Sequence, residues 1–417
     1  MPTPTRSPRR RGSRTDRVAN THEVLALLRA RGPSTQAEIS RATSMSRATI
    51  NHIVQTLRDQ GAVEYQWKNR REALVTLSST SGSIASLLVR SSSVHAIQFD
   101  FTRQERFDIS ASDLPGHRAA ETSPSRVLEF VNWLVKSARE RGSPLTGIAI
   151  AIEGPIEKAT GAIAPWGWHR LPHWKQVNIC QHFSRSVGLP IVVDNDANLA
   201  ALAEWTWGVG RGSRDFLHIT CSEGIGGGIV INGNVYRGGT GLAGEIGHMV
   251  IEEAGDLCFC GSRGCLSSFA TERAILKALR DSGKDISTLR EVIASAQQGD
   301  AACQRVLSEA GSHVGKALAT VVRVIGPSSI AVGGMLGSAG DIILDGLRAS
   351  AEVINLRAIG KSPEFHIATI IDHAAELGGL AAMLSELNLG MSNLSAWMLE
   401  PRTLLSQGAR GPAEASS

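Results

Sequence analysis

From residue 94 onward, the chain alternates short apolar extended runs with apolar helical runs. The extended runs read VHAIQF, TGIAIAI, LPIVV, DFLHIT, GGIVI and SSIAVGG, and the helical runs read ANLAALAEW, GKALATVVRVIG and LGGLAAML. Such alternation is typical of α/β folds, in which helices pack on the faces of a sheet. The pattern therefore predicts an α/β body over residues 94–390, followed by a C-terminal tail over residues 391–417.

Two stretches of this body each predict a β-hairpin. They read VHAIQFDFTRQERFDIS and FLHITCSEGIGGGIVIN, and each would open one half of the body, which suggests a weak internal duplication. The segment before the body, residues 79–93, is rich in Ser and Gly on both sides of a short apolar patch. This composition predicts a linker.

Positive charge is concentrated near the N-terminus. Residues 1–72 hold 14 Lys and Arg against 6 Asp and Glu, so this segment carries +8 in a chain whose net charge is +4. Residues 1–17 form an arm that is too polar to fold alone, and such arms commonly lie along phosphates or in a minor groove. The alternative is a solvated tail with no specific role. The arm contains Arg6, Arg9, Arg10, Arg11 and Arg14.

Residues 18–78 predict a winged helix-turn-helix. Three amphipathic helical runs, THEVLALLRARG, STQAEISRAT and SRATINHIVQTLRDQG, are followed by two extended runs around KNRR, which read as a β-hairpin wing. Thr35 and Glu38 have capping-box spacing at the start of the second helix, and Ser46 is placed to cap the third. The alternative interpretation is a small helical domain that binds another protein.

In a winged helix-turn-helix, the N-terminal residues of the third helix reach base edges in the major groove, while basic residues on the wing neutralise phosphates. Phosphate contacts supply affinity, and base contacts supply sequence preference. The predicted DNA-binding residues are Ser46, Arg47, Thr49 and Asn51 on the third helix, and Lys68, Arg70 and Arg71 on the wing.

The chain is expected to be cytoplasmic, with no membrane partner. No apolar run reaches the roughly 18 residues that cross a bilayer, and the first residues lack the apolar centre of a secretion signal. A reducing compartment disfavours disulfides, so the three cysteines in GDLCFCGSRGCLSS indicate a metal site.

Three blocks resemble, in the same order, the signature blocks of the ROK family (repressors, open reading frames, kinases). They read DNDAN, GIGGGIVINGNVYRGGTGLAGEIGH and CFCGSRGCL. The resemblance implies an actin/hexokinase-like two-lobed body. A winged helix-turn-helix fused before such a body is the arrangement of the family's transcriptional regulators, whereas its sugar kinases generally begin directly with the body.

One imidazole and three thiolates would suit a tetrahedral, structural Zn²⁺ site. Four protein ligands fill the coordination sphere, so the ion would brace a loop and activate no water. Gly261 and Gly264 suit a chain bent tightly around an ion. The alternative is that the thiols are reduced and packed as small hydrophobes. The four expected ligands are His248, Cys258, Cys260 and Cys265.

The ROK resemblance also implies a sugar pocket beside this zinc. Glu245 and His248 match family residues that contact sugar hydroxyls, and Asn195 and Asp196 would form the opposite wall. In the family's kinases, the aspartate at the position of Asp196 activates a sugar hydroxyl as a base. The alternative for Asp196 is an N-cap of the helix ANLAALAEW. The tryptophans of PWGWHRLPHW could stack on a sugar ring or pack in the core.

Two departures from the family pattern argue against catalysis. The kinases carry an Asp-x-Gly-Gly-Thr turn in the first hairpin, and we match it to QFDFT, where Gln98, Asp100 and Phe101 replace the aspartate and both glycines. A side chain at each glycine position would block the backbone from approaching phosphate. In addition, Ser267 stands where kinases have a glutamate that contacts the sugar, which puts the ligand's identity in question.

The sequence thus favours a non-enzymatic, DNA-binding transcriptional regulator, a repressor of carbohydrate uptake or catabolism genes. Its expected partners are a double-stranded DNA operator and a sugar or sugar-phosphate effector, and it is expected to form a homodimer or homotetramer. One alternative is a ROK sugar kinase with an appended DNA-binding domain. Another is a regulator that has lost its ligand and responds through a partner protein.

Overall fold

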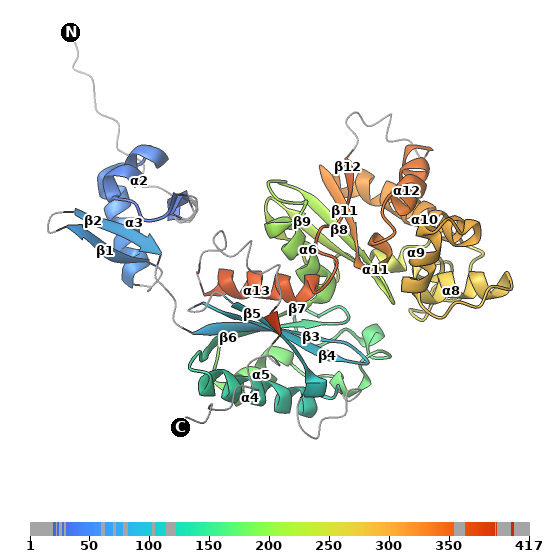
Figure 1. Ribbon diagram of the computed structural model, residues 1–417, viewed down its shortest axis with the longest axis horizontal. Coiled ribbons are helices and arrows are strands. Elements are labelled where there is room, and N and C mark those ends of the chain that lie inside the picture. Colours follow the sequence, from blue (N-terminus) through green and yellow to red (C-terminus); the bar gives the residue numbers. More distant parts are fainter. Residues whose placement is uncertain are drawn as a thin grey trace, which may run out of the picture. The chain divides into compact units, whose positions relative to one another are not determined.

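The chain divides into two compact units (Figure 1). Unit 1 comprises Met1–Ser81 with Leu384–Leu399, and unit 2 comprises Gly82–Met383 with Glu400–Ser417. The computed structural model describes residues 20–21, 23–24, 27–28, 31–59, 63–69, 72–77, 82–101, 105–113, 122–353, 363–387, 389 and 402–403. The predicted arm, residues 1–17, lies outside the described residues.

Unit 1 contains the expected helices and hairpin. Residues 20, 21, 23, 24, 27, 28 and 31 are helical, and helices α2 (Gln36–Thr43) and α3 (Arg47–Asp59) follow. Strands β1 (Val63–Asn69) and β2 (Glu72–Leu77) pair antiparallel. Apolar residues of all these elements share one core, formed by Val24, Leu28, Ile39, Ile50, Ile53, Val54, Leu57, Val63 and Val75.

Two local features set the two ends of α2. Thr35 and Glu38 form the predicted capping box, in which the Thr35 hydroxyl accepts from the Glu38 N–H and the Glu38 carboxylate accepts from the Thr35 N–H. At the other end of α2, Ser44 adopts a left-handed backbone with φ of +55°. This conformation ends α2 and turns the chain into α3.

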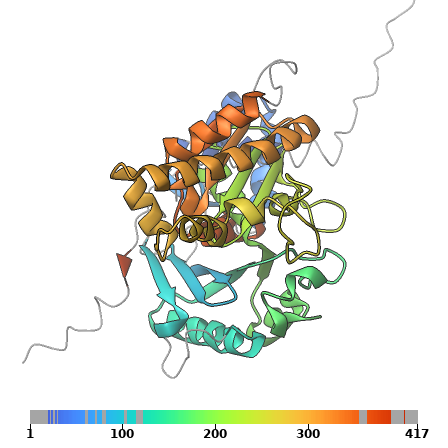
Figure 2. The same cartoon turned by 90° about the vertical axis from the view of Figure 1, so that its right-hand side faces the viewer.

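The first lobe of unit 2 is built on a six-stranded sheet with strand order β13-β5-β4-β3-β6-β7. Helices α4 (Pro124–Glu140) and α5 (Ile179–Val187) cover one face, whereas α13 (Ala374–Glu386) covers the other (Figures 1 and 2). Apolar side chains of α4 and α5 bury the first face. The strands are β3 (Ser83–Val89), β4 (Val94–Asp100), β5 (Glu105–Ser110), β6 (Leu145–Ile152), β7 (Ile191–Asn195) and β13 (Arg402–Thr403).

The predicted boundaries of the body need two corrections. The segment 79–93, predicted as a linker, contains β3, whose seven residues are all buried between β4 and β6. Its flanking serines suggested a linker, but the apolar patch between them is a central strand. The segment 391–417, predicted as a tail, contains β13, which pairs in parallel with β5.

The second lobe is built on a five-stranded sheet with strand order β10-β9-β8-β11-β12. Helix α6 (Asp196–Trp207) contacts β8 and β9 on one face, and helices α8, α9, α10 and α12 bury the other (Figure 1). Both predicted hairpins are confirmed, because β4 pairs antiparallel with β5 and β8 with β9. The strands are β8 (Phe216–Cys221), β9 (Ile225–Ile231), β10 (Asn234–Val235), β11 (Ser329–Gly333) and β12 (Glu364–Ile367).

A glycine brings α6 close to β9. A Cβ atom on Gly228 would lie 2.3 Å from the Cβ of Ala201 and 2.5 Å from the carbonyl oxygen of Ala197, so no side chain fits at this position. The remaining helices of the lobe are α7 (Ser267–Ala270), α8 (Glu272–Asp281), α9 (Leu289–Gln297), α10 (Ala301–Ile325), α11 (Gly334–Gly337) and α12 (Asp341–Val353). Short 3₁₀ turns occur at Ala111–Asp113, Pro165–Gly167, Pro172–Trp174 and Ile246–His248.

The strand directions determine where a site can form. Strands β3, β6 and β7 run parallel, so their C-terminal ends meet at one edge of the first sheet. Ligands of α/β folds bind at such an edge. Among the described helices, none has the length and apolar character needed to span a membrane.

Candidate functional site

A cavity of about 720 Å³ opens at this edge of the first sheet. Arg90, Glu153 and Asp196 line it, and each directly follows the C-terminal end of β3, β6 or β7. Residues of the second lobe line the opposite side, so both lobes contribute to one pocket. Those residues include Ser222, Glu223, Gly224, Glu245, His248, Ser267, Thr271, Glu272 and Arg273.

Asp196 is a half-buried carboxyl group in the first-lobe wall. Its Oδ1 accepts hydrogen bonds from the Ala197 N–H (3.0 Å) and from Nδ2 of Asn195 (3.2 Å). Burial raises its pKa above the usual value, and the positive charges of Arg90 and Arg170 partly oppose that rise. Asp196 lines the cavity, where its carboxylate, when ionised, can accept a hydrogen bond from a ligand hydroxyl.

Asn195, and not Asp196, is the N-cap of α6. Its Oδ1 accepts from the N–H groups of Ala197 (2.9 Å) and Asn198 (3.2 Å), and its Nδ2 donates to the Gly154 carbonyl oxygen (3.0 Å). Asn195 lines the cavity, but most of its hydrogen-bonding capacity is used within the protein. The structure thus gives the capping role to Asn195 and leaves Asp196 facing the pocket.

Glu245 faces the same pocket from the second lobe. Burial, with a further contribution from the negative charge of Asp196, raises the pKa of Glu245 to about 8. At neutral pH the protonated form is therefore favoured, and its O–H can donate a hydrogen bond. The pocket thus pairs one carboxyl group that accepts with another that can donate, which matches the dual character of hydroxyl ligands.

An ion pair that the sequence did not predict crosses the pocket wall. Arg170 pairs with Glu153, and its Nη2 also approaches the Glu223 carbonyl oxygen (3.5 Å). Three chain segments supply these groups, so spacing along the sequence gave no indication of the contact. Strand order is what could have indicated a pocket here, because Arg90 and Glu153 follow strands whose C-terminal ends meet at one edge of the sheet.

The predicted position of the phosphate turn is wrong. QFDFT ends β4, which runs antiparallel to β3, so Asp100 pairs with Ser83 at the edge far from the pocket. Gln98 is buried there, where its Nε2 donates to Oγ of Ser83 (2.8 Å) and its Oε1 accepts from Arg141 (2.6 Å). These contacts make Gln98 part of the packing of the sheet.

The turn at the pocket edge joins β3 to β4 and reads Arg-Ser-Ser-Ser, residues 90–93. The Arg90 N–H donates to the Ser93 carbonyl oxygen (2.9 Å), and the Ser91 N–H donates to Oε2 of Glu153 (3.0 Å). This turn contains no glycine, and the Arg90 side chain lines the pocket. The obstacle to a close backbone–phosphate approach therefore exists, but at a different turn from the one predicted.

The segment PWGWHRLPHW contributes residues other than tryptophan to the lining of the pocket. Gly167, His169 and Arg170 line the pocket. Trp174 is fully buried, donates to the Thr122 carbonyl oxygen (2.7 Å) and stacks on Phe183, so the core-packing interpretation holds for this residue. Trp168 donates to the Ile163 carbonyl oxygen (2.9 Å).

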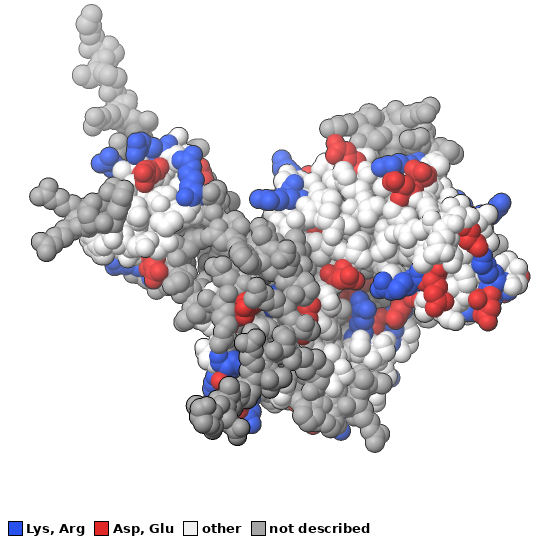
Figure 3. Space-filling model, viewed as in Figure 1, with Lys and Arg blue, Asp and Glu red and all other residues white. Residues whose placement is uncertain are grey.

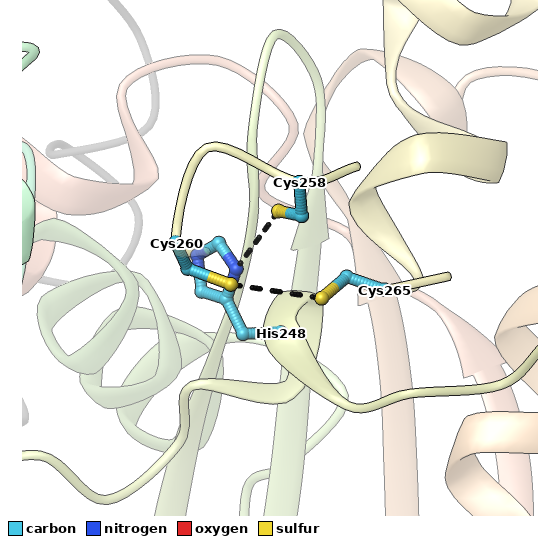
Figure 4. Close-up of side chains that lie close together, drawn as sticks. All are labelled: His248, Cys258, Cys260 and Cys265. Carbon is cyan, nitrogen blue, oxygen red and sulfur yellow. Dashed lines mark hydrogen bonds between the residues drawn. The ribbon is translucent and has the colours of Figure 1, made fainter. Parts of the chain in front are cut away.

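The predicted metal ligands meet in one cluster next to the pocket (Figure 4). Sγ of Cys258 lies 3.5 Å from Nδ1 of His248, Sγ of Cys260 lies 3.7 Å from Sγ of Cys265, and all four donor atoms lie within 4.8 Å of one another. Burial is the main cause that lowers the pKa of His248, which keeps its imidazole neutral, as a metal ligand must be.

The loop that carries the thiols turns back at a glycine. Gly264 has φ of +62°, and a Cβ atom there would lie 1.5 Å from the Glu252 carbonyl oxygen. Isolated bridges pair Val250 with Cys265 and Leu257 with Arg263. The four side chains therefore converge because the chain folds back on itself, and they can hold one divalent metal ion.

The third helix of unit 1 presents the predicted base-reading residues. Arg47 and Asn51 are exposed on α3, whereas Ser46 and Thr49 form its cap, in which Oγ of Ser46 accepts from the Thr49 N–H (3.1 Å). Figure 3 shows Lys and Arg side chains over the surface of this unit. On the wing, the Lys68 side chain and residues Arg70 and Arg71 lie outside the described residues.

Comparisons with known proteins match both parts of the chain. The sequence profile of the ROK family matches residues 97–386, and that of the IclR helix-turn-helix domain matches residues 18–66. A xylose repressor from Caldicellulosiruptor bescii is 27% identical over 375 residues, which cover 84% of this chain and 92% of the relative.

Two further relatives match to different extents. A glucokinase from Halalkalibacterium halodurans is 35% identical over 253 residues, which cover 57% of this chain and 76% of the relative. Among solved structures, a ROK family transcriptional regulator described as a homolog of the E. coli MLC protein superposes with a TM-score of 0.77 at 21% identity. That superposition covers 91% of this chain and 98% of the regulator, so the two share a fold over nearly their whole lengths.

Proposed function

The chain belongs to the ROK family, and from this membership we propose that it is a sugar-responsive, DNA-binding transcriptional repressor. The observation that carries the proposal is that one chain joins a helix-turn-helix with an exposed third helix to a pocket lined by hydroxyl-binding groups. The similarity to a named xylose repressor extends over both parts, whereas that to a glucokinase covers 57% of the chain.

The pocket supports a sugar or sugar phosphate as the effector. Asp196 offers an acceptor and Glu245 a donor, and the two groups enter from opposite lobes. Arg90 and Arg170 add positive charge beside Asp196 and would favour a ligand that carries an anionic group. A ligand that bonds both walls stabilises the arrangement of the lobes in which both contacts form.

We infer that the cluster of His248 and three cysteines holds Zn²⁺. For tetrahedral ligands at about 2.1 Å for nitrogen and 2.3 Å for sulfur, neighbouring donor atoms lie roughly 3.6 to 3.8 Å apart. The distances of 3.5 Å and 3.7 Å agree with this geometry. The ion would supply a rigid structural link and no hydrolytic chemistry, because four protein ligands fill its coordination sphere.

The metal cluster would position the effector wall. His248 lies three residues after Glu245 and ends the same 3₁₀ turn, whose N-cap is Glu245. Fixing the imidazole therefore restricts where the Glu245 carboxyl group points. Ser267, which follows Cys265 by two residues, donates from Oγ to the Gly247 carbonyl oxygen (2.8 Å) and joins the two segments.

Operator binding would require at least two copies of the chain. A dimer presents two recognition helices to two half-sites, and its specificity exceeds that of one helix alone. We propose a homodimer or homotetramer in the cytoplasm, in which effector binding changes the spacing of the helices. The base contacts would come from Arg47 and Asn51, and the wing residues Lys68, Arg70 and Arg71 would contact phosphates.

The proposal is tested by selecting duplexes that the full chain binds from a random-sequence pool. Selected duplexes are then titrated with protein, with and without pentoses, hexoses, N-acetylhexosamines and their phosphates. A defined motif whose affinity changes with one of these compounds supports the proposal. Absence of any selected motif contradicts it, whereas a motif unaffected by every compound favours the regulator that has lost its ligand.

A further inference from the structure

A second group of metal-ligating side chains lies outside the cysteine cluster. His95 at the start of β4, His373 just before α13 and Glu376 in its first turn bring their donor atoms within 4.8 Å of one another. The segment that carries His373 and Glu376 crosses the face of the sheet on which His95 stands. His95 and Glu376 are 281 residues apart in the sequence, so the fold brings the cluster together.

The donor atoms converge on one point. Nδ1 of His95 lies 2.9 Å from Oε1 of Glu376, and Nδ1 of His373 lies 3.2 Å from the same oxygen. The two imidazole rings stack with centroids 4.4 Å apart and planes inclined by 21°, so both Nδ1 atoms face the carboxylate side by side. With metal–ligand bonds of about 2.0 to 2.2 Å, ligands at right angles lie roughly 2.8 to 3.1 Å apart and tetrahedral ligands roughly 3.3 to 3.6 Å apart, and both observed distances fall within this range.

The carboxylate retains unused binding capacity. The Glu376 side chain is 3% exposed, and its Oε2 has no hydrogen-bond partner in the described part of the chain. A buried carboxylate oxygen without a partner is costly, and a cation satisfies it. Glu376, His95 and His373 line a cavity of about 250 Å³, so an ion could enter from that side and keep an open coordination position.

The neighbouring side chains would orient one of the ligands. Oδ2 of Asp108 lies 3.8 Å from Nε2 of His373, on the side of the ring opposite to Glu376. Arg106 holds Asp108 through two hydrogen bonds, from Nε to Oδ1 (2.7 Å) and from Nη2 to Oδ2 (2.9 Å). A carboxylate behind a metal-bound histidine is a recurrent arrangement that fixes the ring and its tautomer.

We propose that His95, His373 and Glu376 form a second metal site, which binds a divalent transition ion of the Zn²⁺, Co²⁺ or Ni²⁺ class. Two imidazole nitrogens and one carboxylate suit these ions, whereas Mg²⁺ and Ca²⁺ prefer ligand sets of oxygen alone. Three protein ligands leave a position for water or another ligand from the cavity, unlike the closed cysteine site. The inference does not rest on the proposed repressor function, although Arg90, Asp196 and Ser222 line both this cavity and the effector pocket.

The test uses full-length protein that has been dialysed against a weak chelator until about one Zn²⁺ per chain remains, so that the cysteine site is filled and the proposed second site is empty. Equilibrium dialysis against Co²⁺, followed by elemental analysis, is expected to add about one Co²⁺ per chain while the zinc content stays unchanged. Co²⁺ bound to nitrogen and oxygen gives weak visible bands without the intense thiolate charge-transfer absorption that it gives in a cysteine site. The spectrum therefore distinguishes the two sites.

Glu376→Gln keeps the size of the side chain and is expected to weaken Co²⁺ uptake at least tenfold, and His95→Gln is expected to have a similar effect. Asp108→Asn is expected to weaken it about tenfold through loss of ring orientation. His366→Gln on β12 is the matched control, since His366 also lies near a carboxylate, Glu364 (3.6 Å), and should bind Co²⁺ as the unaltered protein does. Unaltered protein that takes up no Co²⁺ would overturn the proposal, as would equal uptake by folded Glu376→Gln or His95→Gln.

Discussion

The hydroxyl group of Ser267 donates a hydrogen bond to the carbonyl oxygen of Gly247, 2.8 Å away. This bond links the start of α7 to the short turn between Glu245 and His248, and so connects the pocket wall that carries Glu245 to the cluster of His248 and three cysteines. Its proton is used within the protein, but the oxygen still lines the pocket. Ser267 therefore acts first as a support for the turn that carries Glu245.

Ser267→Ala is expected to lower the free energy of unfolding by about 1 kcal/mol, the usual net effect of losing one hydrogen bond. Effector affinity should fall as well, because the turn that carries Glu245 loses a constraint. Urea unfolding measures the first effect, and calorimetric titration with the sugar that gives the largest thermal shift measures the second. Unchanged affinity with the expected loss of stability would show that Ser267 supports the fold alone.

Arg47→Ala is expected to cost about 1 to 3 kcal/mol of binding free energy at the selected duplex and to relax its sequence preference. The physical reason is that Arg47 is exposed near the N-terminus of α3, where side chains reach base edges. Lys68→Ala is the contrasting variant, which should weaken all duplexes similarly and reduce the salt dependence. Fluorescence anisotropy at fixed salt with specific and unrelated duplexes checks both effects, and equal losses on both duplexes for Arg47→Ala would contradict the assignment.

Protein purified without chelator and passed through gel filtration is expected to retain about one tightly bound Zn²⁺ per chain, as a filled four-ligand site requires. Cys260→Ser should lose that ion and lower the melting temperature, because the loop that turns at Gly264 loses its link. Cys180→Ser, which removes an exposed cysteine outside the cluster, is the matched control. Elemental analysis that finds no zinc in the unaltered protein would refute the assignment.

Effector affinity is expected to fall as the pH is lowered. Burial raises the pKa of Asp196 above its usual value of 3.8, so this carboxyl group takes up a proton at a higher pH than a free aspartate does. The ionised form accepts a hydrogen bond from the effector, so affinity is present above the raised pKa and lost as the pH falls through it. Calorimetric titrations at successively lower pH measure this loss. In Asp196→Asn, the loss of effector affinity at low pH should disappear. If that loss persists, a group other than Asp196 causes it.

Features that depend on neighbouring residues in the sequence were predictable. The capping box of Thr35 and Glu38 and both hairpins follow from short-range spacing, and the structure confirms them. The three cysteines lie close together in the sequence, which indicated that they converge. His248, which precedes the loop, was the one ligand that had to be added from outside it.

Features that depend on strand order were not predictable. Residues 83–89 read as part of a linker because serines flank them, although they form the strand that ends just before Arg90. Because that strand was missed, the phosphate turn was matched to the β4–β5 hairpin instead of the β3–β4 turn, and QFDFT was assigned to the wrong edge of the sheet. Glu153 and Arg170 were not predicted as pocket residues for the same reason. The pocket forms where the parallel strands β3, β6 and β7 end, and this arrangement depends on strand order.

The protein is expected to bind its effector without phosphorylating it. The turn at residues 90–93 contains no glycine, whereas turns that bring backbone N–H groups close to phosphate are rich in glycine, and Arg90 lines the pocket there. Asp196 and Glu245, in contrast, are available to bind hydroxyl groups from two sides. Coupled assays with common pentoses, hexoses and N-acetylhexosamines should therefore detect no sugar-dependent ATP consumption.

The same compounds, tested by thermal unfolding, should include one that raises the melting temperature of the unaltered protein but not of Asp196→Ala. The substitution removes the central acceptor of the first-lobe wall, so ligand binding and its thermal shift should disappear together. Robust sugar phosphorylation would instead identify the chain as a kinase with an added DNA-binding unit. In that case Asp196→Ala should abolish turnover, because its carboxylate would be the base that activates the sugar hydroxyl.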